Sequence, residues 1–466
     1  MVELTAAAVF GVYAIASALV LQLVNTEVRT PYMDEQFHIR QAQWYCMGAF
    51  NKWDPKLTTP PGLYIVSLVV RTMGACTLDR LRAVNCVLGC ILFWAVYALI
   101  RQNARPFRAA IKALTLCMLP TSFFFAHVYY TDIASLLCVL LAQLLSVHKR
   151  HVWAGVVGGA AVWMRQTNVV WVALVGGAAV ERWMRENGVV SGGLVQSVGQ
   201  LVQWMKSPRR WREAVWVAVP YAFVVMAFGV FVRVNGGIVL GDKSNHQAGV
   251  HVPQMFYFYA FTAAMAAPTV LAEAQRYTHA VTSRQVTCFE MANYALETVY
   301  ANLYLYLACY RPVLSTAVGL ALTLVMAVGV NRFTVEHPFL LGDNRHYTFY
   351  IWKNLFRSCW WARYLYIPGY VSCMLGVHAA LWRAPALWHV MWLVCTAAVL
   401  VPSPLLELRY FTVPFFLARL HMPTSLPRLS IELAMYIVVN TVTIYVFLYH
   451  PFVWSSEPNQ LQRFMW

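Results

Sequence analysis

Charged residues are scarce in this chain of 466 residues. Asp, Glu, Lys and Arg together make up 12% of it, against about 25% in an ordinary soluble domain. Hydrophobic residues account for 60% and aromatic residues for 15%, and the mean hydropathy is +0.55. This balance excludes a soluble globular protein of ordinary composition. It predicts an all-α polytopic membrane protein whose apolar runs cross the bilayer as helices.

Several functional motifs are also missing. The cysteines have no CxxC or other metal-ligand spacing, and the chain has no Asn-x-Ser/Thr sequon. No GxxxxGK[ST] or GxGxxG phosphate loop follows a strand, and no segment is large enough for a soluble nucleotide-sugar domain. We therefore expect no metal, no cofactor and no soluble nucleotide donor.

Acidic residues are the scarcer charged class, with 19 Asp and Glu against 35 Lys and Arg, so the formal net charge is +16. A basic chain can bind nucleic acid, but here the Lys and Arg residues lie in short loops between apolar runs and form no contiguous basic face. Membrane topology explains them better, because short cytoplasmic loops collect Lys and Arg. We expect no nucleic-acid partner.

The first apolar run, Leu4 to Val24, has about the 20 residues that cross a bilayer. It has no basic segment before it and no small-residue cleavage site, so we interpret it as a retained helix. With the runs that follow, it predicts about 12 or 13 spans, since short runs can tilt, pair or re-enter. These runs lie at about 82–101, 112–126, 131–147, 152–164, 168–183, 213–234, 253–272, 312–331, 364–382, 386–402, 410–421 and 430–450.

Three loops rich in Lys and Arg are assigned to the cytoplasm by the positive-inside rule. They are 101–112, the HKRH sequence at 148–151, and 184–212. The opposite side then receives the polar motifs. These lie at about 25–80, 127–132, 165–168, 235–246 and 343–353. Polar motifs gathered on one side of a membrane indicate a single catalytic chamber.

The first large loop carries a segment, 60–74, that is too short and misplaced for a span, so we expect an amphipathic helix in the membrane interface. Cys46 and Cys76 flank this loop and can pair across it, whereas most of the eleven cysteines lie inside apolar runs. Segment 273–311 is interpreted as a cytoplasmic excursion. It divides the chain into an N-terminal transmembrane module, 1–272, and a C-terminal one, 312–466.

A polar cluster follows the first apolar run, with the sequence PYMDEQFHIRQAQWYC at 31–46. It places Asp34 and Glu35 side by side with His38 and Arg40 at a membrane edge, where charge is expensive unless it has a function. Group transfer to a hydroxyl needs a base, and these carboxylates are the catalytic candidates, Asp34 being favoured. Its neighbour then orients substrate, His38 or Arg40. Alternatively, Asp34 only caps the helix predicted after it.

Other polar residues on the same side are candidates for binding substrate. Arg165, Lys243, Arg345 and His346 suit the oxygens of an anionic leaving group. Alternatively, Arg345 and His346 contact lipid headgroups or form a local salt bridge with Asp343. Trp44 and Trp53 can stack on sugar rings, and Asp132 can bind sugar hydroxyls or cap its helix. Glu407 and Arg409 are expected to pair with each other structurally. The remaining candidate binding residues are Asp54, Tyr130, Gln166, Asn168, Asp242, His246, Asp343, Asn344 and Tyr347.

Seven sequence strings, in this order, resemble one family. They are MDEQFHIRQAQWYC at 33–46, WDPKLTTPPGLY at 53–64, RQTNVVWV at 165–172, NGGIVLGDKSNH at 235–246, DNRHYTFYIWK at 343–353, LLELRYFTVP at 405–414 and QRFMW at 462–466. The family is that of the dolichyl-phosphate-glucose-dependent alpha-1,2-glucosyltransferases of the endoplasmic reticulum, which add the final glucose to the lipid-linked oligosaccharide used for N-glycosylation. The resemblance runs from residue 31 to the last residue.

The resemblance implies a multi-pass enzyme of the endoplasmic reticulum membrane with the GT-C fold, whose active site faces the lumen and whose first lumenal loop carries the catalytic carboxylate. The implied donor is dolichyl-phosphate-glucose, and the acceptor is the diglucosylated Glc2Man9GlcNAc2 diphosphodolichol. A beta-linked donor and an alpha-linked product imply inversion by a single displacement. Arg and Lys can neutralise a monophosphate leaving group, so the chemistry does not require a metal.

A transporter or scramblase predicts inverted repeats with broken helices in both halves, and no such repeat is visible. A dolichyl-phosphate-mannose or protein mannosyltransferase shares the first-loop acid, but the strings at 343–353 and 462–466 argue against it. A noncatalytic membrane adaptor has no need for so many polar motifs on one side.

Overall fold

The computed structural model describes residues 2–189, 200, 208–243, 248–282, 312–334 and 343–466. The described helices up to residue 235 are α1 (Val2–Glu27), α2 (Glu35–Cys46), α3 (Gly62–Val66), η1 (Ser67–Met73), α4 (Leu78–Arg101), α5 (Pro106–Cys117), α6 (Pro120–Phe125), α7 (Asp132–Val147), α8 (His151–Met164), α9 (Asn168–Glu186) and α11 (Pro208–Asn235). Those that follow are α12 (Pro253–Met265), α13 (Ala267–Thr282), α16 (Pro312–Phe333), α18 (Tyr347–Ile351), η2 (Trp352–Phe356), α19 (Ala362–Leu365), α20 (Ile367–Ala380), α21 (Ala386–Leu400), η3 (Leu408–Phe411), α22 (Thr412–His421) and α23 (Leu426–Tyr449).

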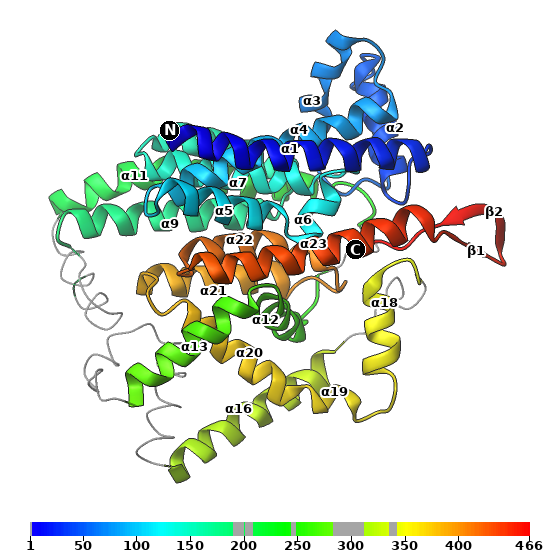
Figure 1. Cartoon of the computed structure of the whole chain (residues 1–466). Coiled ribbons are helices and arrows are strands. Elements are labelled where there is room, and N and C mark those ends of the chain that lie inside the picture. The colour runs from blue at the N-terminus through cyan, green and yellow to red at the C-terminus, as the bar shows by residue number, and fades with distance from the viewer. Residues whose placement is uncertain (1, 190–199, 201–207, 244–247, 283–311, 335–342) are drawn as a thin grey trace.

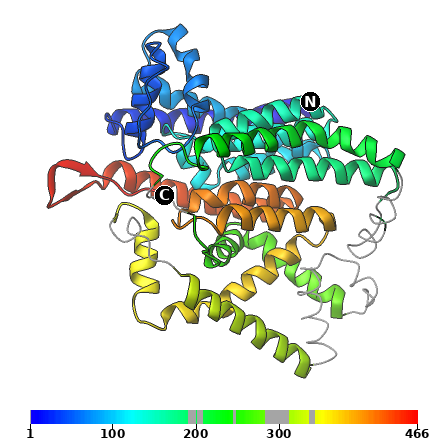
Figure 2. The same cartoon turned by 180° about the vertical axis from the view of Figure 1, so that it is seen from behind.

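The helices are stacked in layers (Figure 1). The first layer holds α1, α4, α5, α7, α8, α9 and α11, with α7 packed on α8 and α4, and α11 packed on α9 and α8. A second layer of α21, α22 and α23 lies against it, through contacts of α21 with α9 and of α23 with α5. Helices α12, α13, α16, α19 and α20 lie beyond the second layer, as the reverse view also shows (Figure 2).

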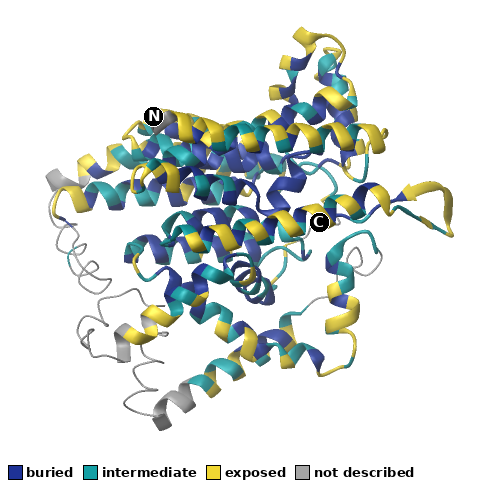
Figure 3. Cartoon of the chain, viewed as in Figure 1, coloured by how far each residue is buried: buried dark blue, intermediate teal, exposed yellow. Residues whose placement is uncertain are grey.

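Four described segments are long and apolar enough to cross a membrane, namely Leu4–Glu27, Leu78–Arg101, Arg212–Asn235 and Leu426–Tyr449. Each has 24 residues and so spans about 36 Å, more than the roughly 30 Å of hydrocarbon in a bilayer. Many residues of α1 are exposed (Figure 3), and they include Leu4, Val12, Ile15, Leu19 and Leu23, as expected for a surface that lipid solvates. The chain is an all-α polytopic membrane protein.

Most of the other predicted spans are shorter helices, and proline interrupts some of them. The run at 112–126 is divided between α5 and α6 at Pro120, which cannot donate a backbone hydrogen bond. The run at 253–272 is divided between α12 and α13, which meet at 94° just before Pro268. The total of 12 or 13 spans stays a prediction.

The predicted helix at 60–74 is present as α3 and the 3-10 helix η1. Gly62 allows α3 to lie against α8, because an added Cβ would come within 2.5 Å of the backbone oxygen of Trp163. The predicted pairing of Cys46 with Cys76 is confirmed as a disulfide that ties the end of α2 to the start of α4. The interfacial position of α3 and η1 stays a prediction.

A short hairpin near the C-terminal end was not predicted. Strands β1 (Phe452–Trp454) and β2 (Glu457–Gln462) pair antiparallel, and the chain then returns toward the helices. Residue Met465 forms a parallel bridge with His346. The domain division at 273–311 stays a prediction, since residues 283–311 lie outside the described part of the chain.

The disulfide gives a test of this loop. Non-reducing digestion and mass spectrometry of the purified protein should yield a peptide containing Cys46 linked to one containing Cys76. Closing a loop of this length stabilises a protein by roughly 2–4 kcal/mol, so Cys46→Ser should lower the thermal midpoint measurably. Cys373→Ser, which removes a thiol outside the disulfide, is the control. An unlinked pair, or equal midpoints for the two variants, would contradict the pairing.

Candidate active site

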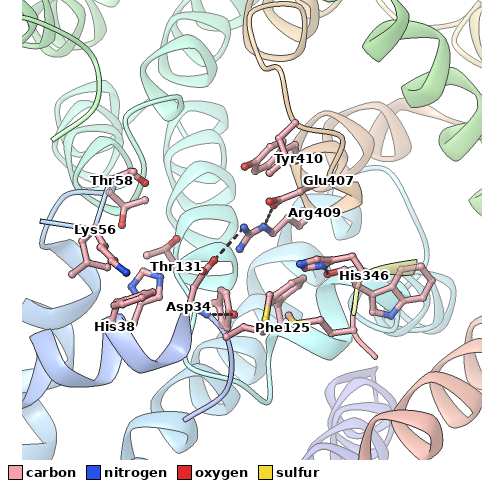
Figure 4. Close-up of a pocket in the computed structure, with 18 of the residues that line it drawn as sticks. Asp34, His38, Lys56, Thr58, Phe125, Thr131, His346, Glu407, Arg409 and Tyr410 are labelled. Atoms are coloured by element: carbon pink, nitrogen blue, oxygen red, sulfur yellow. Dashed lines mark hydrogen bonds and ion pairs between the residues drawn. The ribbon is translucent and has the colours of Figure 1, made fainter. Parts of the chain in front are cut away.

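A cavity of about 760 Å³ lies where the polar motifs meet (Figure 4). It is lined by residues from α2, the α6–α7 turn, the loop before η3, and five further segments at 55–59, 165, 242, 343–348 and 465–466. Among them are Met33, Asp34, Phe37, His38, Pro55, Lys56, Leu57, Thr58, Thr59, Phe125, Tyr130, Thr131, Arg165, Asp242, Asp343, Arg345, His346, Glu407, Arg409, Tyr410 and Trp466. Segments more than 400 residues apart in the sequence thus form one chamber.

Asp34 presents its carboxylate to this cavity, with 52% of its side chain exposed. Its backbone N–H donates to the Tyr130 hydroxyl at 3.1 Å, and its side chain makes no capping hydrogen bond to α2. The cap interpretation of the sequence therefore lacks its defining contact. The preceding residue, Met33, has φ 53, a conformation that costs energy outside glycine and often marks functional sites.

Glu35 points the other way. Its side chain is fully buried, and its two carboxylate oxygens accept hydrogen bonds of 2.8 and 2.6 Å from the Arg82 guanidinium. The backbone N–H groups of Tyr32 and Tyr129 also donate to it. All its acceptor capacity is used inside the protein, so only Asp34 of the predicted acidic pair lines the cavity.

Arg409 is the central cation of the site. It forms an ion pair with Glu407, and its guanidinium lies 3.7 Å from Asp34 and 3.8 Å from Asp132. Burial acts to lower the pKa of Arg409, but Glu407 and Asp132 outweigh it and the pKa lies well above its usual value. Burial likewise acts to raise the pKa of Glu407, and Arg409 outweighs this and holds it below its usual value.

The predicted pairing of Glu407 with Arg409 is therefore present. The interpretation that the pair is only structural did not foresee that it lies at the cavity. Both residues line the cavity, as does Tyr410, and none of the three was among the predicted site residues. Lys56, which lies over the Phe37 ring at 5.2 Å, was missed as well. The motif LLELRY carries the signal, because it places two charges between apolar runs.

Arg165 extends the charge network. Its guanidinium lies 3.0 Å from Asp132 and 5.7 Å from the centre of the Tyr410 ring. Asp132 is thereby held between Arg165 and Arg409 at the start of α7. Two guanidinium groups side by side at one cavity wall suit an anionic ligand such as a phosphate.

The motif DNRHY forms another part of the wall. Arg345 makes the predicted pair with Asp343, at 2.7 Å, and donates to Gln462 at 3.0 Å. Its guanidinium also lies 4.6 Å from the centre of the Trp454 ring. Burial acts to raise the pKa of Asp343, but hydrogen bonds from Arg345 outweigh it and lower it. Arg345 is thus held in place by the C-terminal hairpin.

Loop 235–243 reaches the cavity because its backbone packs closely against that of segment 55–58. The N–H of Asp242 donates to the Pro55 carbonyl at 3.0 Å, and that of Leu240 donates to the Thr58 carbonyl. Gly241 permits this, since an added Cβ would lie 2.3 Å from the Pro55 oxygen. Asp242 itself adopts φ 43 and lines the cavity.

The other predicted site residues lie behind or beside the cavity and do not line it. Arg40 is 3.5 Å from Asp54, Lys243 donates to the Asn235 carbonyl, and Asn168 donates to Ser135 and the Ala161 carbonyl. Trp44, Trp53, Gln166, Asn344 and Tyr347 are likewise not among the lining residues. His246 lies outside the described residues.

The Glu35–Arg82 pair predicts a large stability effect. Glu35→Gln should lower the free energy of unfolding by about 3–5 kcal/mol, because it leaves a buried guanidinium without a counter-charge. Glu186→Gln, which breaks an exposed pair with Lys149, should cost less than about 1 kcal/mol. Thermal unfolding in detergent measures both. A Glu35→Gln midpoint equal to that of Glu186→Gln would contradict the structural role.

His38 predicts a pH dependence. Its ring bonds the Tyr64 hydroxyl at 2.8 Å, and burial, with Arg409 and Arg165 nearby, lowers its pKa from 6.5 to about 3. Between these values the unfolded chain binds a proton that the folded chain does not, so stability falls as the pH drops below 6.5. From pH 6.5 to 5 the loss is roughly 2 kcal/mol.

Unfolding measured at pH 7.5, 6.5 and 5.0 should therefore show a smaller acid sensitivity in His38→Gln than in the unchanged protein. Other buried histidines titrate in both proteins and cancel in this comparison. Identical pH profiles would show that His38 is protonated normally in the folded state.

Comparison with known proteins identifies the family of the chain. The model of the DIE2/ALG10 family matches residues 28–420. A relative from Rattus norvegicus is 35% identical, covering 97% of this chain and 96% of the relative, and one from Drosophila melanogaster is 34% identical, covering 93% of each. A third, from Arabidopsis thaliana, is 31% identical over the whole of both chains. All three are named Dol-P-Glc:Glc(2)Man(9)GlcNAc(2)-PP-Dol alpha-1,2-glucosyltransferase.

No solved structure is significantly similar to the chain. The match to the family model covers most of the sequence and includes the cavity-lining residues from Met33 to Tyr410. The lining residues Met465 and Trp466 lie beyond it. The chain belongs to the DIE2/ALG10 family.

Proposed function

We propose that this protein transfers one glucose from dolichyl-phosphate-glucose to Glc2Man9GlcNAc2 diphosphodolichol and forms an alpha-1,2 linkage. The observation that carries the proposal is the exposed Asp34 carboxylate, set 3.7 Å from Arg409 in a cavity that the family's polar motifs line. The names of the relatives supply the donor and acceptor. The cavity volume of about 760 Å³ lies within the range of about 300–1,000 Å³ usual for small-molecule sites.

The proposed reaction is a single displacement at the anomeric carbon of the donor glucose. Asp34 accepts the proton of the acceptor 2-hydroxyl, and the resulting oxygen nucleophile attacks the anomeric carbon. The bond from that carbon to the phosphate oxygen breaks, and dolichyl phosphate leaves with the electron pair. A carboxylate that is half exposed to the cavity can reach substrate, whereas the buried Glu35 cannot.

The leaving phosphate needs compensation for its growing negative charge, and Arg409 and Arg165 are the proposed source. Both guanidinium groups are already oriented by carboxylates, so little reorganisation accompanies the reaction. Phosphate bound to Arg409 competes with Asp34 for the same cation. Donor binding therefore weakens the Asp34 interaction with Arg409 and makes Asp34 a better base.

The proposed location is the endoplasmic reticulum membrane, with the cavity facing the lumen. The Cys46–Cys76 disulfide near the cavity supports this orientation, because disulfides persist in oxidising compartments such as the lumen. The basic loops at 101–112 and 148–151 lie at the other ends of the helices, consistent with the positive-inside rule. The GT-C fold implied by the family resemblance is part of the same proposal.

Asp34→Asn tests the base directly. It keeps the size of the side chain but removes its basicity, so transfer of hexose should fall by about 10²–10⁴-fold while the thermal midpoint stays within a few degrees. The assay follows the mass of the oligosaccharide after incubation with dolichyl-phosphate-glucose. Asp79→Asn, an exposed acid in the first turn of α4 outside the cavity, is the matched control. Unchanged rates in a folded Asp34→Asn protein would rule Asp34 out as base.

Arg409→Lys tests the phosphate contact. Lys keeps the charge but loses the planar fork, so kcat/KM for the donor should fall by about tenfold or more, as for loss of one charge-assisted hydrogen bond. Lys243→Gln removes a cation of the same polar loops that does not line the cavity, and its donor kinetics should match those of the unchanged protein. Equal effects of the two substitutions would contradict a specific role for Arg409.

A further inference from the structure

A second cavity lies at the other ends of the transmembrane helices. It has a volume of about 540 Å³ and is formed by the C-terminal ends of α4, α7 and α9 together with α5, α21 and α22. Helix α7 follows Thr131, which lines the first cavity, and ends at Val147, which lines the second. The two cavities therefore lie at opposite ends of α7, and the second has no part in the proposed reaction.

The lining of this second cavity carries an excess of positive charge. Its Lys and Arg side chains are Arg108, Lys112, Arg182 and Arg185, whereas Glu181 is its acid. Glu181 is occupied, because one of its oxygens accepts hydrogen bonds of 3.2 and 2.9 Å from Arg185. Within the described part of the chain, no direct ion pair joins Arg108, Lys112 or Arg182 to a carboxylate of the lining.

Lys112 is the most informative of these cations. It is buried, with an exposed fraction of 5%, and its ammonium donates to the Met422 carbonyl at 3.0 Å. No ion pair joins it to a carboxylate within the described part of the chain. An ammonium has three donors, and a buried cation whose charge is not balanced is costly. The nearby buried acid, Glu432, is already paired with Arg419.

Arg182 shows the same pattern. Its guanidinium donates to the Ser146 carbonyl at 3.1 Å, which leaves further N–H groups of its five. The apolar part of the lining comes from Leu99, Ile100 and Trp388, whose ring lies tilted against that of His421 with centroids 3.7 Å apart. Cations with spare donors beside an apolar wall at a membrane face suit a phosphate group with a hydrophobic attachment, and they also accept free phosphate.

We propose that the second cavity is a phosphate-binding site, with Lys112, Arg182 and Arg108 as its ligands. The phosphate is the headgroup of a membrane lipid or is free in solution. In both cases it supplies the negative charge that the lining lacks, at the membrane face opposite to the first cavity.

Native mass spectrometry of the delipidated full-length protein in detergent tests this site. The probes are dioleoyl phosphatidic acid, dioleoyl phosphatidylcholine, whose headgroup has no net charge, and inorganic phosphate. The variants are Lys112→Met and Arg108→Gln, the second at an exposed position where misfolding is not expected. Lys149→Met removes a cation near the same ends of the helices that pairs with Glu186 and does not line the cavity, so it is the matched control.

The unchanged protein and Lys149→Met should bind phosphatidic acid or inorganic phosphate with equal affinity, and Lys112→Met and Arg108→Gln should bind it about tenfold more weakly. Preference for phosphatidic acid over phosphatidylcholine, without binding of inorganic phosphate, identifies a lipid headgroup. Binding of inorganic phosphate identifies the free ion. No binding of either probe, or equal binding by Arg108→Gln and Lys149→Met, would overturn the proposal, even if Lys112→Met fails to fold.

Discussion

The ion pair between Glu35 and Arg82 is the constraint on which the site depends. Both side chains are fully buried, and the Arg82 guanidinium also donates to the carbonyl of Val28 at 2.7 Å. Glu35 in turn accepts the backbone N–H of Tyr129. One pair thus joins α4, the end of α1, the start of α2 and the turn before α7. Because adjacent residues at a helix start point in different directions, fixing Glu35 inward directs Asp34 into the cavity.

The charges of the cavity are arranged around Arg409, which likewise joins several segments of the chain. Asp34, Asp132 and Glu407 approach one guanidinium from three different segments, and Arg165 shares Asp132. Fixed charges in a partly buried site interact more strongly than in water and need not reorganise when a reaction begins. The same arrangement explains how a phosphate at Arg409 affects Asp34, since both compete for one cation.

The sequence was sufficient for the features that depend on nearby residues. Apolar runs gave the helices, the two loop cysteines gave the disulfide, and the polar cluster at 31–46 gave Asp34. Features that depend on contacts between distant residues could not be predicted from the sequence. The choice between Asp34 and Glu35 requires Arg82, which is 47 residues from Glu35, and the C-terminal segment is anchored by Arg463 to Tyr32, 431 residues away. Such pairings leave no local pattern.

The position of Glu407 and Arg409 at the cavity could not be predicted for a related reason. Its motif was recognised, but a pair of opposite charges two residues apart is most simply explained by mutual pairing. That pairing exists, and only the packing of the loop against the α6–α7 turn shows that Arg409 also reaches Asp34 and Asp132. A charged pair next to a membrane-embedded chamber can therefore be structural and functional at once.

The most direct test of the account is the reaction of the purified, unchanged protein with diglucosylated lipid-linked oligosaccharide. Dolichyl-phosphate-glucose and dolichyl-phosphate-mannose are offered separately, and mass spectrometry with linkage analysis follows the product. We expect a gain of one hexose in alpha-1,2 linkage with the glucosyl donor alone. Transfer from the mannosyl donor instead, or no transfer from either donor by folded protein, would contradict it.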